Sequence, residues 1–432
     1  MSWHILFFLM MSALELRDDP IIEINGNVFF SSQYLMAEGT AIKNKSDVEN
    51  LVAQIIRFYT DAGYPFCRIY PEIVAEDNVI KKIVLTIEEG SRITVSDYIY
   101  DIQGKTAEGV VKKIMGLKPD SYFSSEEINH SKEKLLRTRV FENITDNIIH
   151  RDGNYYVLFS LKERKSDYLT TFGSFGESDI NFSINFFSLN LLGTLRQLQF
   201  DYEYQKLFAL QFTEPVLIFP ASLNIRFSLW TYDSVRLIQF NGRFIAPLGD
   251  IFNVSLLSGV EAMSYPENNS NAQGHTNNLL GIGFGLVYDT LNLSFKQEIN
   301  FEYLFRHYDR WKMQYDSEFD INKFIIKTHY YTVETDSFEY FDHYRIGGAK
   351  DLRGYYDEEL IASHAMWLNC EYKKFLIFPL FDVGLLDHDI QFSYGLGIEA
   401  KSRFADASLI IAWPKHGSWQ DGKIHLMFEK GF

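Results

Sequence analysis

The feature that most constrains the fold is a period-two alternation of apolar and polar residues that fills the chain after Asp167. Such alternation is typical of strands with two different faces, joined here by short turns and a few longer polar segments. We expect about sixteen strands, an even number, as in closed bacterial membrane barrels. The expected strands are residues 168–176, 180–192, 195–205, 208–218, 221–232, 235–247, 251–264, 277–288, 291–305, 310–321, 324–335, 362–375, 378–386, 390–402, 407–413 and 423–432. Because so many long strands exceed a single soluble sandwich, the pattern predicts a transmembrane antiparallel β-barrel over residues 167–432.

Composition agrees with a barrel and excludes helical membrane spans. No run of eighteen apolar residues occurs, so a closed barrel is the one structure through which this chain could cross a bilayer. A mean hydropathy of -0.14 fits such a barrel, because its apolar residues alternate with polar ones that line the lumen. The net charge of -16 argues against nucleic acid as a partner.

The chain before residue 167 shows a different, α+β pattern. A short strand at 21–27 and a helix at 48–61 are followed by two more strands, and a similar order of elements then recurs. This internal repeat predicts two small domains, at residues 20–91 and 92–166. Residues 1–19 contain an apolar run that resembles the core of a secretory signal, although the basic start is missing. We expect a signal peptide or a short N-terminal segment there.

Residues suited to covalent chemistry do not form a recognisable site. Cys67 and Cys370 lie in different expected domains and lack metal-ligand spacing, so we interpret both as packing residues. Asp342, His343 and Asp382 are not accompanied by a nucleophile elbow, a metal motif or a phosphate loop. We therefore expect no enzyme activity, no metal and no cofactor. Asp342 and His343 are interpreted as solvated loop residues.

Several motifs resemble those of one superfamily. The segment Tyr59–Pro65 is similar to a Y-x-x-x-G-Y-P motif, and Gly347–Tyr355 is similar to G-G-x-x-x-[VL]-R-G-[FY]. Leu380–Gly384 matches F-x-D-x-G except that Leu380 replaces the first aromatic residue. Together these motifs resemble the outer membrane protein 85 superfamily, which contains BamA, TamA, the mitochondrial sorting-and-assembly barrel and the two-partner-secretion transporters. The resemblance implies two periplasmic POTRA domains followed by a sixteen-stranded outer-membrane barrel.

The resemblance places the glycine-arginine motif in a long loop, residues 338–361, that folds into the barrel. Its motif residues are Gly347, Gly348, Arg353, Gly354 and Tyr355. A guanidinium inside a barrel needs carboxylate partners, because an unpaired buried charge is costly. Glu371 and Asp382, on the next two expected strands, are the candidates.

The resemblance also implies that the first and last barrel strands meet in a lateral seam. Gly173, Gly176, Gly431 and Phe432 lie on these strands, and glycine weakens strand pairing. An exposed strand edge at an open seam could pair with an incoming strand. In the first POTRA domain, Gly63 and Tyr64 are expected to mark an edge for the same kind of client.

These features rank three functions. First is a BamA- or TamA-like assembly factor for outer-membrane proteins, which would bind unfolded clients through its periplasmic domains and insert them through the seam. Its expected partners are unfolded outer-membrane or secreted polypeptides, outer-membrane lipid, and periplasmic chaperones or accessory lipoproteins. Second is a two-partner-secretion transporter, although members of that family usually carry a plug helix, for which the residues before Pro20 leave little room. Third is a passive porin or surface antigen.

Overall fold

The computed structural model describes residues 15–36, 45–76, 79–175, 180–215, 220–232, 235–249, 251–266, 274–289, 293–339, 341–402 and 405–431. The chain divides into two compact units, Met1–Glu163 and Arg164–Phe432. Within the described ranges, no helix is long and apolar enough to cross a membrane. Most of the expected signal segment, residues 1–14, lies outside these ranges.

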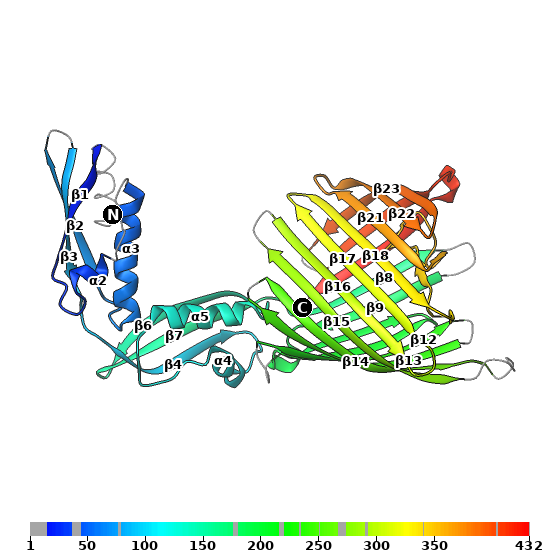
Figure 1. Cartoon of the computed structure of the whole chain (residues 1–432), viewed down its shortest axis with the longest axis horizontal. Helices are drawn as coiled ribbons and strands as arrows, with labels where there is room; N and C mark the ends of the chain where they lie inside the picture. Colours follow the sequence, from blue (N-terminus) through cyan, green and yellow to red (C-terminus); the bar gives the residue numbers. More distant parts are fainter. Residues whose placement is uncertain are drawn as a thin grey trace. The chain divides into compact units, whose positions relative to one another are not determined.

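The first half of the N-terminal unit packs one long helix on a three-stranded sheet (Figure 1). Its elements are β1 (Glu15–Asn25), α2 (Ser32–Leu35), α3 (Lys45–Asp61), β2 (Arg68–Glu76) and β3 (Val79–Glu88). The sheet order is β1-β3-β2, with β1 parallel and β2 antiparallel to β3. Helix α3 buries Val48, Leu51 and Ile55, the apolar side chains at helical spacing, against the sheet core.

The second half of this unit is a four-stranded sheet with two helices. Its elements are β4 (Thr94–Gln103), α4 (Glu108–Met115), β5 (Ser121–Tyr122), α5 (Ser125–Leu136), β6 (Phe141–Arg151) and β7 (Asn154–Glu163), in the sheet order β5-β4-β7-β6. Helix α4 ends at Gly116, which adopts a left-handed conformation with φ of 65°. Helix α5 begins after Ser124, whose hydroxyl accepts the backbone N–H of Glu127 at 3.2 Å.

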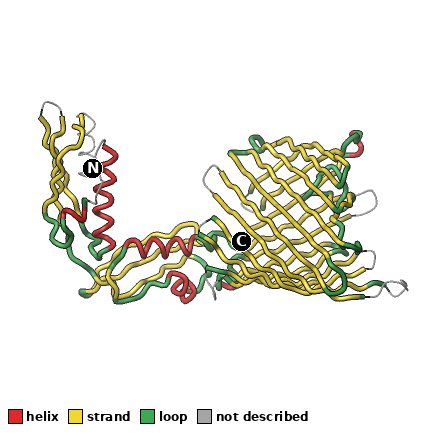
Figure 2. Tube along the Cα trace, in the orientation of Figure 1, coloured by secondary structure: helices red, strands yellow, loops and turns green. Residues whose placement is uncertain are grey.

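The second unit is a closed, antiparallel barrel of sixteen strands, which confirms the predicted architecture of this region (Figures 1 and 2). The strands are β8 (Asp167–Phe175), β9 (Ile180–Ser188), β10 (Gln197–Glu203), β11 (Leu207–Glu214), β12 (Ser222–Tyr232), β13 (Val235–Leu248), β14 (Phe252–Ser264), β15 (His275–Asp289), β16 (Leu293–Phe305), β17 (Arg310–Ile321), β18 (Phe324–Thr335), β21 (His364–Tyr372), β22 (Ile377–Leu386), β23 (Asp389–Lys401), β24 (Asp406–Pro414) and β25 (Lys423–Gly431). Strand β25 pairs with β8 and closes the ring.

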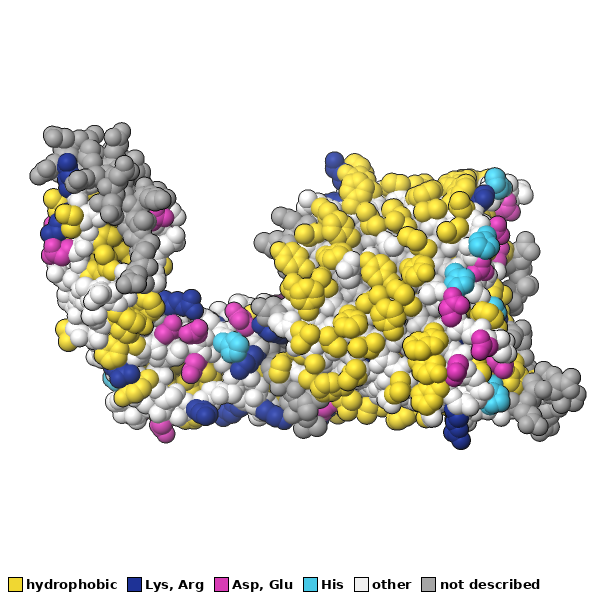
Figure 3. Space-filling view, viewed as in Figure 1, with side chains coloured by type: hydrophobic (Ala, Val, Ile, Leu, Met, Phe, Trp, Pro, Cys, Tyr) yellow, Lys and Arg dark blue, Asp and Glu magenta, His cyan; other side chains and the backbone are white. Residues whose placement is uncertain are grey.

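The barrel turns its apolar side chains outward and many polar ones inward. In β22, Phe381 and Leu385 are exposed, whereas Asp382 between them is fully buried on the lumen side. Hydrophobic side chains cover the visible outer surface of the barrel, while acidic and histidine side chains gather along one rim (Figure 3). A closed barrel with an apolar band outside and polar groups inside is suited to span a lipid bilayer.

Candidate functional site: the inserted loop and the closing seam

The loop between β18 and β21 is organised as a small hairpin. Strand β19 (Tyr344–Ile346) pairs antiparallel with β20 (Leu360–Ala362), and the segment between them forms the tip of the loop. Gly347 begins this segment with φ of 133°, and a Cβ there would lie 2.1 Å from the carbonyl oxygen of Tyr356. The tip therefore needs glycine at this position for both its backbone angle and its close approach.

Arg353 is buried in the barrel lumen, with 3% of its surface exposed. Its Nε lies 3.0 Å from Asp382 Oδ2 and its Nη2 lies 2.5 Å from Asp382 Oδ1, a bidentate pair. Nη1 forms an ion pair with Glu371. The structure thus brings Arg353 against the two carboxylates that the sequence suggested, Glu371 on β21 and Asp382 on β22.

The groups around Arg353 fix Asp382 in place. The backbone N–H of Arg353 and the hydroxyl of Ser393 both donate to Asp382 Oδ2, at 3.1 and 3.0 Å. Asp382 therefore has its acceptor positions filled in a site closed to solvent, as a buried carboxylate requires.

Gly354 and Tyr355 seat the tip on the barrel wall. A Cβ at Gly354 would lie 2.6 Å from both Ser393 Cβ and the carbonyl oxygen of Trp413, so a larger residue does not fit without a shift. The Tyr355 hydroxyl donates to Gln391 Oε1 at 2.9 Å. The motif's glycine and aromatic residues are thus fitted to strands β23 and β24.

A second buried arginine holds the base of the loop, and the sequence analysis missed it. Arg310, the first residue of β17, contacts Asp342 Oδ1 through Nη1 at 2.5 Å, and Glu261 Oε2 through Nη2 at 3.3 Å. Asp342 is fully buried and also accepts the backbone N–H of Glu339 at 2.7 Å. The expectation that Asp342 is solvated is therefore wrong.

His343 is half-buried, so the expectation of a solvated side chain fails there too. Its ring stacks on Phe338, with centroids 4.7 Å apart, and its Nδ1 lies 3.2 Å from Ser363 Oγ. The signal that could have found the base network was a charged residue, Arg310 or Glu261, at an inward position of a predicted strand. Such a residue needs a partner from elsewhere in the lumen.

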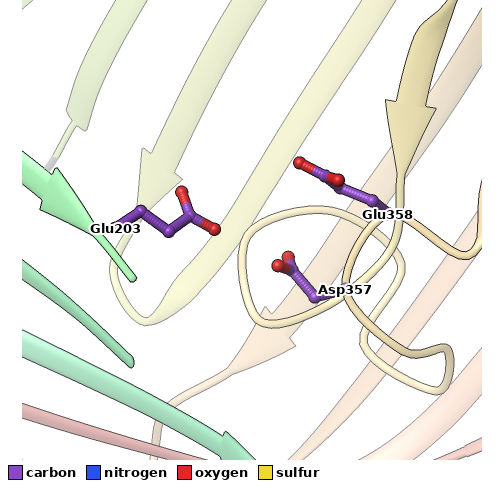
Figure 4. A group of neighbouring side chains, drawn as sticks. All are labelled: Glu203, Asp357 and Glu358. Atoms are coloured by element: carbon purple, nitrogen blue, oxygen red, sulfur yellow. The ribbon is translucent and has the colours of Figure 1, made fainter. Parts of the chain in front are cut away.

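The far side of the loop tip meets the turn between β10 and β11. Lys206 Nζ lies 2.7 Å from Asp357 Oδ2 and 3.4 Å from Glu358 Oε2. Glu203, at the end of β10, points toward the same two carboxylates (Figure 4). Because the Lys206 ammonium already lies among these three acids, the cluster is an ion-pair network that ties the tip to the opposite wall.

The seam between β8 and β25 is a short ladder. It runs over seven described residue pairs, from Tyr168 opposite Gly431 to Ser174 opposite His425, whereas β13 and β14 share thirteen pairs. Gly173 faces Leu426 across the seam. Fewer paired residues mean fewer backbone hydrogen bonds to break when two strands separate.

The seam glycines differ in their surroundings. A Cβ at Gly173 would meet no atom within 4 Å, whereas one at Gly431 would lie 3.1 Å from the ring of Tyr168. The other two expected seam residues, Gly176 and Phe432, lie outside the described residues.

Comparison with known proteins identifies the fold. No family model matches the sequence. A BamA structure from Haemophilus ducreyi lacking POTRA domains 1-3 aligns with a TM-score of 0.59 and 15% identity, over 96% of this chain and 100% of that one. CdiB from Acinetobacter baumannii and CdiB from Escherichia coli each align with a TM-score of 0.56 and 11% identity, over 96% of this chain and 90% of theirs. The chain has the fold of these proteins. The resemblance seen in the sequence motifs is confirmed at the level of the fold.

The BamA-like and CdiB-like chain carries its two expected client residues in a turn. Gly63 ends α3 with φ of 102°, and Tyr64 packs its ring against Phe29 and Tyr59, with centroids 5.1 and 5.8 Å away. Neither residue lies on a strand. The described strands at the two sides of this sheet are β1 and β2.

Proposed function

We propose that this chain is an assembly factor of the bacterial outer membrane that inserts other β-barrel proteins through its lateral seam. In this proposal residues 20–91 and 92–166 are POTRA domains in the periplasm, and they receive unfolded clients before insertion. The role is BamA- or TamA-like, and it requires neither a cofactor nor a covalent reaction. The fold shared with BamA supports it.

The observation that carries the proposal is a short seam beside an occupied lumen. The seam ladder has seven described pairs, and opening it breaks only those backbone bonds. The lumen holds a loop tied down by two buried arginines, Arg353 and Arg310. Emptying the lumen would separate buried ion pairs, which costs far more than parting exposed ones. A sideways exit leaves both networks in place.

The N-terminal unit offers strand edges for client capture. Strand β2 lies at one side of its sheet, and Tyr70 and Val74 on it are exposed. An unpaired edge with apolar side chains can bind an extended peptide through main-chain hydrogen bonds, with side-chain contacts adding affinity. This places the proposed client contact at β2, near Gly63 and Tyr64 but not on them.

A second function, two-partner secretion, is supported by the equal coverage of the two CdiB structures. In that role a single secreted protein would pass through the lumen. The loop would then have to leave its seat on β21 and β22, so Arg353 would separate from Glu371 and Asp382 during each transport event.

Depletion of the protein in its host cells tests which function holds. Wild-type chain and Arg353→Glu are compared for their ability to restore the depleted cells, with heat-modifiable gel mobility as the check that each barrel folds. An assembly factor predicts that many outer-membrane proteins are lost on depletion and are not restored by a folded Arg353→Glu barrel. Loss of one secreted protein, with outer-membrane proteins intact, would replace this function by secretion.

A further inference from the structure

His425 connects the inserted loop to the last strand of the barrel. It lies on β25, is 4% exposed, and its Nε2 is 2.7 Å from the carbonyl oxygen of Arg353. A carbonyl oxygen only accepts, so Nε2 carries the proton and donates it. The imidazole therefore bonds the backbone of the very residue whose guanidinium pairs with β21 and β22.

A second contact on β25 lies close by. The ammonium of Lys423 lies 3.4 Å from the centroid of the Tyr356 ring, a cation-π contact with the loop tip. Lys423 and His425 are two residues apart and therefore share one face of the strand. The loop thus contacts β25 at two adjacent lumen-facing positions.

The loop's contact with the other seam strand is looser. Lys350 Nζ lies 5.1 Å from the centroid of the Phe172 ring on β8. A cavity of about 180 Å³ separates this part of the loop from β8 and β9, lined among others by Phe172, Gly173 and Phe182. Packing is therefore open on the β8 side and closed on the β25 side.

We propose that His425 fastens the loop to β25, so that the loop and β25 stay together as one body when the seam parts, and β8 is the strand that moves away. The proposal rests on the seam opening that the proposed function requires, and it adds which strand stays. His425 acts here as a positioning residue, through its bond to the Arg353 carbonyl. The argument rests on the difference between a buried hydrogen bond of 2.7 Å to β25 and a ring contact of 5.1 Å beside a cavity on β8.

Distances between spin labels measure this coupling directly. In a Cys67→Ser, Cys370→Ser background, one label is placed on the loop at Glu359→Cys. The second is placed on β25 at Phe428→Cys or, in a separate protein, on β8 at Leu169→Cys; both positions are exposed on the outer face of the barrel. Double electron-electron resonance on the full chain in lipid nanodiscs then gives one distance distribution for each strand.

The proposal predicts that the distribution from the loop to β25 is narrow and that His425→Leu broadens it. His425→Gln keeps an N–H donor and should restore the narrow distribution, which a merely space-filling role would not produce. Glu429→Ala is the matched control: Glu429 lies on the same face of β25 and accepts from Thr170 Oγ1 of β8 at 3.3 Å. That variant should broaden only the distribution from the loop to β8.

Two results would overturn the proposal. One is a folded His425→Leu barrel, verified by heat-modifiable mobility, whose loop-to-β25 distribution equals that of the wild type. The other is a wild-type distribution that is broader from the loop to β25 than from the loop to β8. Because no client is present, failure here leaves the insertion function standing, and failure of insertion leaves the fastening by His425 standing.

Discussion

Single residues decide whether the loop stays in the lumen, and Arg353 is the foremost of them. Its guanidinium satisfies two carboxylates, Asp382 and Glu371, inside a site with almost no solvent. Removing the arginine would leave Asp382 charged, buried and without its cation. The partners could be proposed from sequence because they lie on the next two predicted strands at inward positions.

We predict that Arg353→Ala lowers the free energy of unfolding of the barrel by about 3–5 kcal/mol, the usual effect of breaking a buried ion pair. The measurement is urea unfolding followed by heat-modifiable mobility. The control is Arg226→Ala, which removes a more exposed lumen pair, with Arg226 Nη2 3.6 Å from Asp201 Oδ2, and should cost about 0–1 kcal/mol. Equal losses in the two variants would contradict a special role for the Arg353 site.

At the same scale, Cys67 is predicted to be unreactive in the folded protein. Burial, with a smaller contribution from the carboxylate of Glu89, raises the pKa of the Cys67 thiol to about 11. The charged form is disfavoured, so at pH 8 only about one thiol in a thousand is a thiolate, the form that alkylates. In a Cys370→Ser chain, iodoacetamide should react much more slowly with native than with urea-unfolded protein. The native rate should rise as the pH approaches 11; similar native and unfolded rates at pH 8 would contradict this.

At the scale of elements, the hairpin β19–β20 and its glycines shape the loop tip. Gly354 lies so close to β23 and β24 that a methyl group would contact Ser393 and Trp413 at 2.6 Å. The tip therefore fits the wall only with glycine at this position, whereas Gly173 on β8 has free space around it.

We predict that Gly354→Ala lifts the tip from its seat, and that Gly173→Ala does not. Trypsin cleavage after Lys350, an exposed loop residue, measures the difference in the folded barrel. Gly354→Ala should be cleaved faster than wild type, because its tip is held less tightly. Identical cleavage rates in the two variants would show that the close approach at Gly354 does not hold the loop.

The elements also show how far sequence carries. The alternation predicted all sixteen barrel strands, because period two reports directly on which face of a strand meets lipid. Strand ends were less predictable: the strand expected over 180–192 stops at Ser188, since residues 191–193 form a 3-10 turn with Leu192 at φ of 51°. The burial of Asp342 could not be predicted, because Arg310 and Glu261 reach it from strands distant in sequence.

At the scale of the whole molecule, a stable barrel contains one weak line. Two arginine networks hold the loop, and the Lys206 network ties its tip to the opposite wall. The seam remains the short ladder, and its lumen-facing pairs include Thr170 with Glu429. The molecule is therefore expected to respond to a client by parting this seam, with the loop still seated.

Locking the seam tests this account most directly. Thr170→Cys and Glu429→Cys, in a Cys67→Ser, Cys370→Ser chain, place two thiols on directly opposed residues, a spacing that a disulfide can bridge. The control pair, Gln199→Cys with Gln211→Cys, joins β10 to β11 away from the seam. The purified chain in liposomes is given a urea-unfolded outer-membrane barrel, and folding of that client is followed by heat-modifiable mobility. The account predicts that oxidation abolishes the acceleration of client folding in the seam variant alone and that reduction restores it; full acceleration with the seam disulfide formed would contradict it.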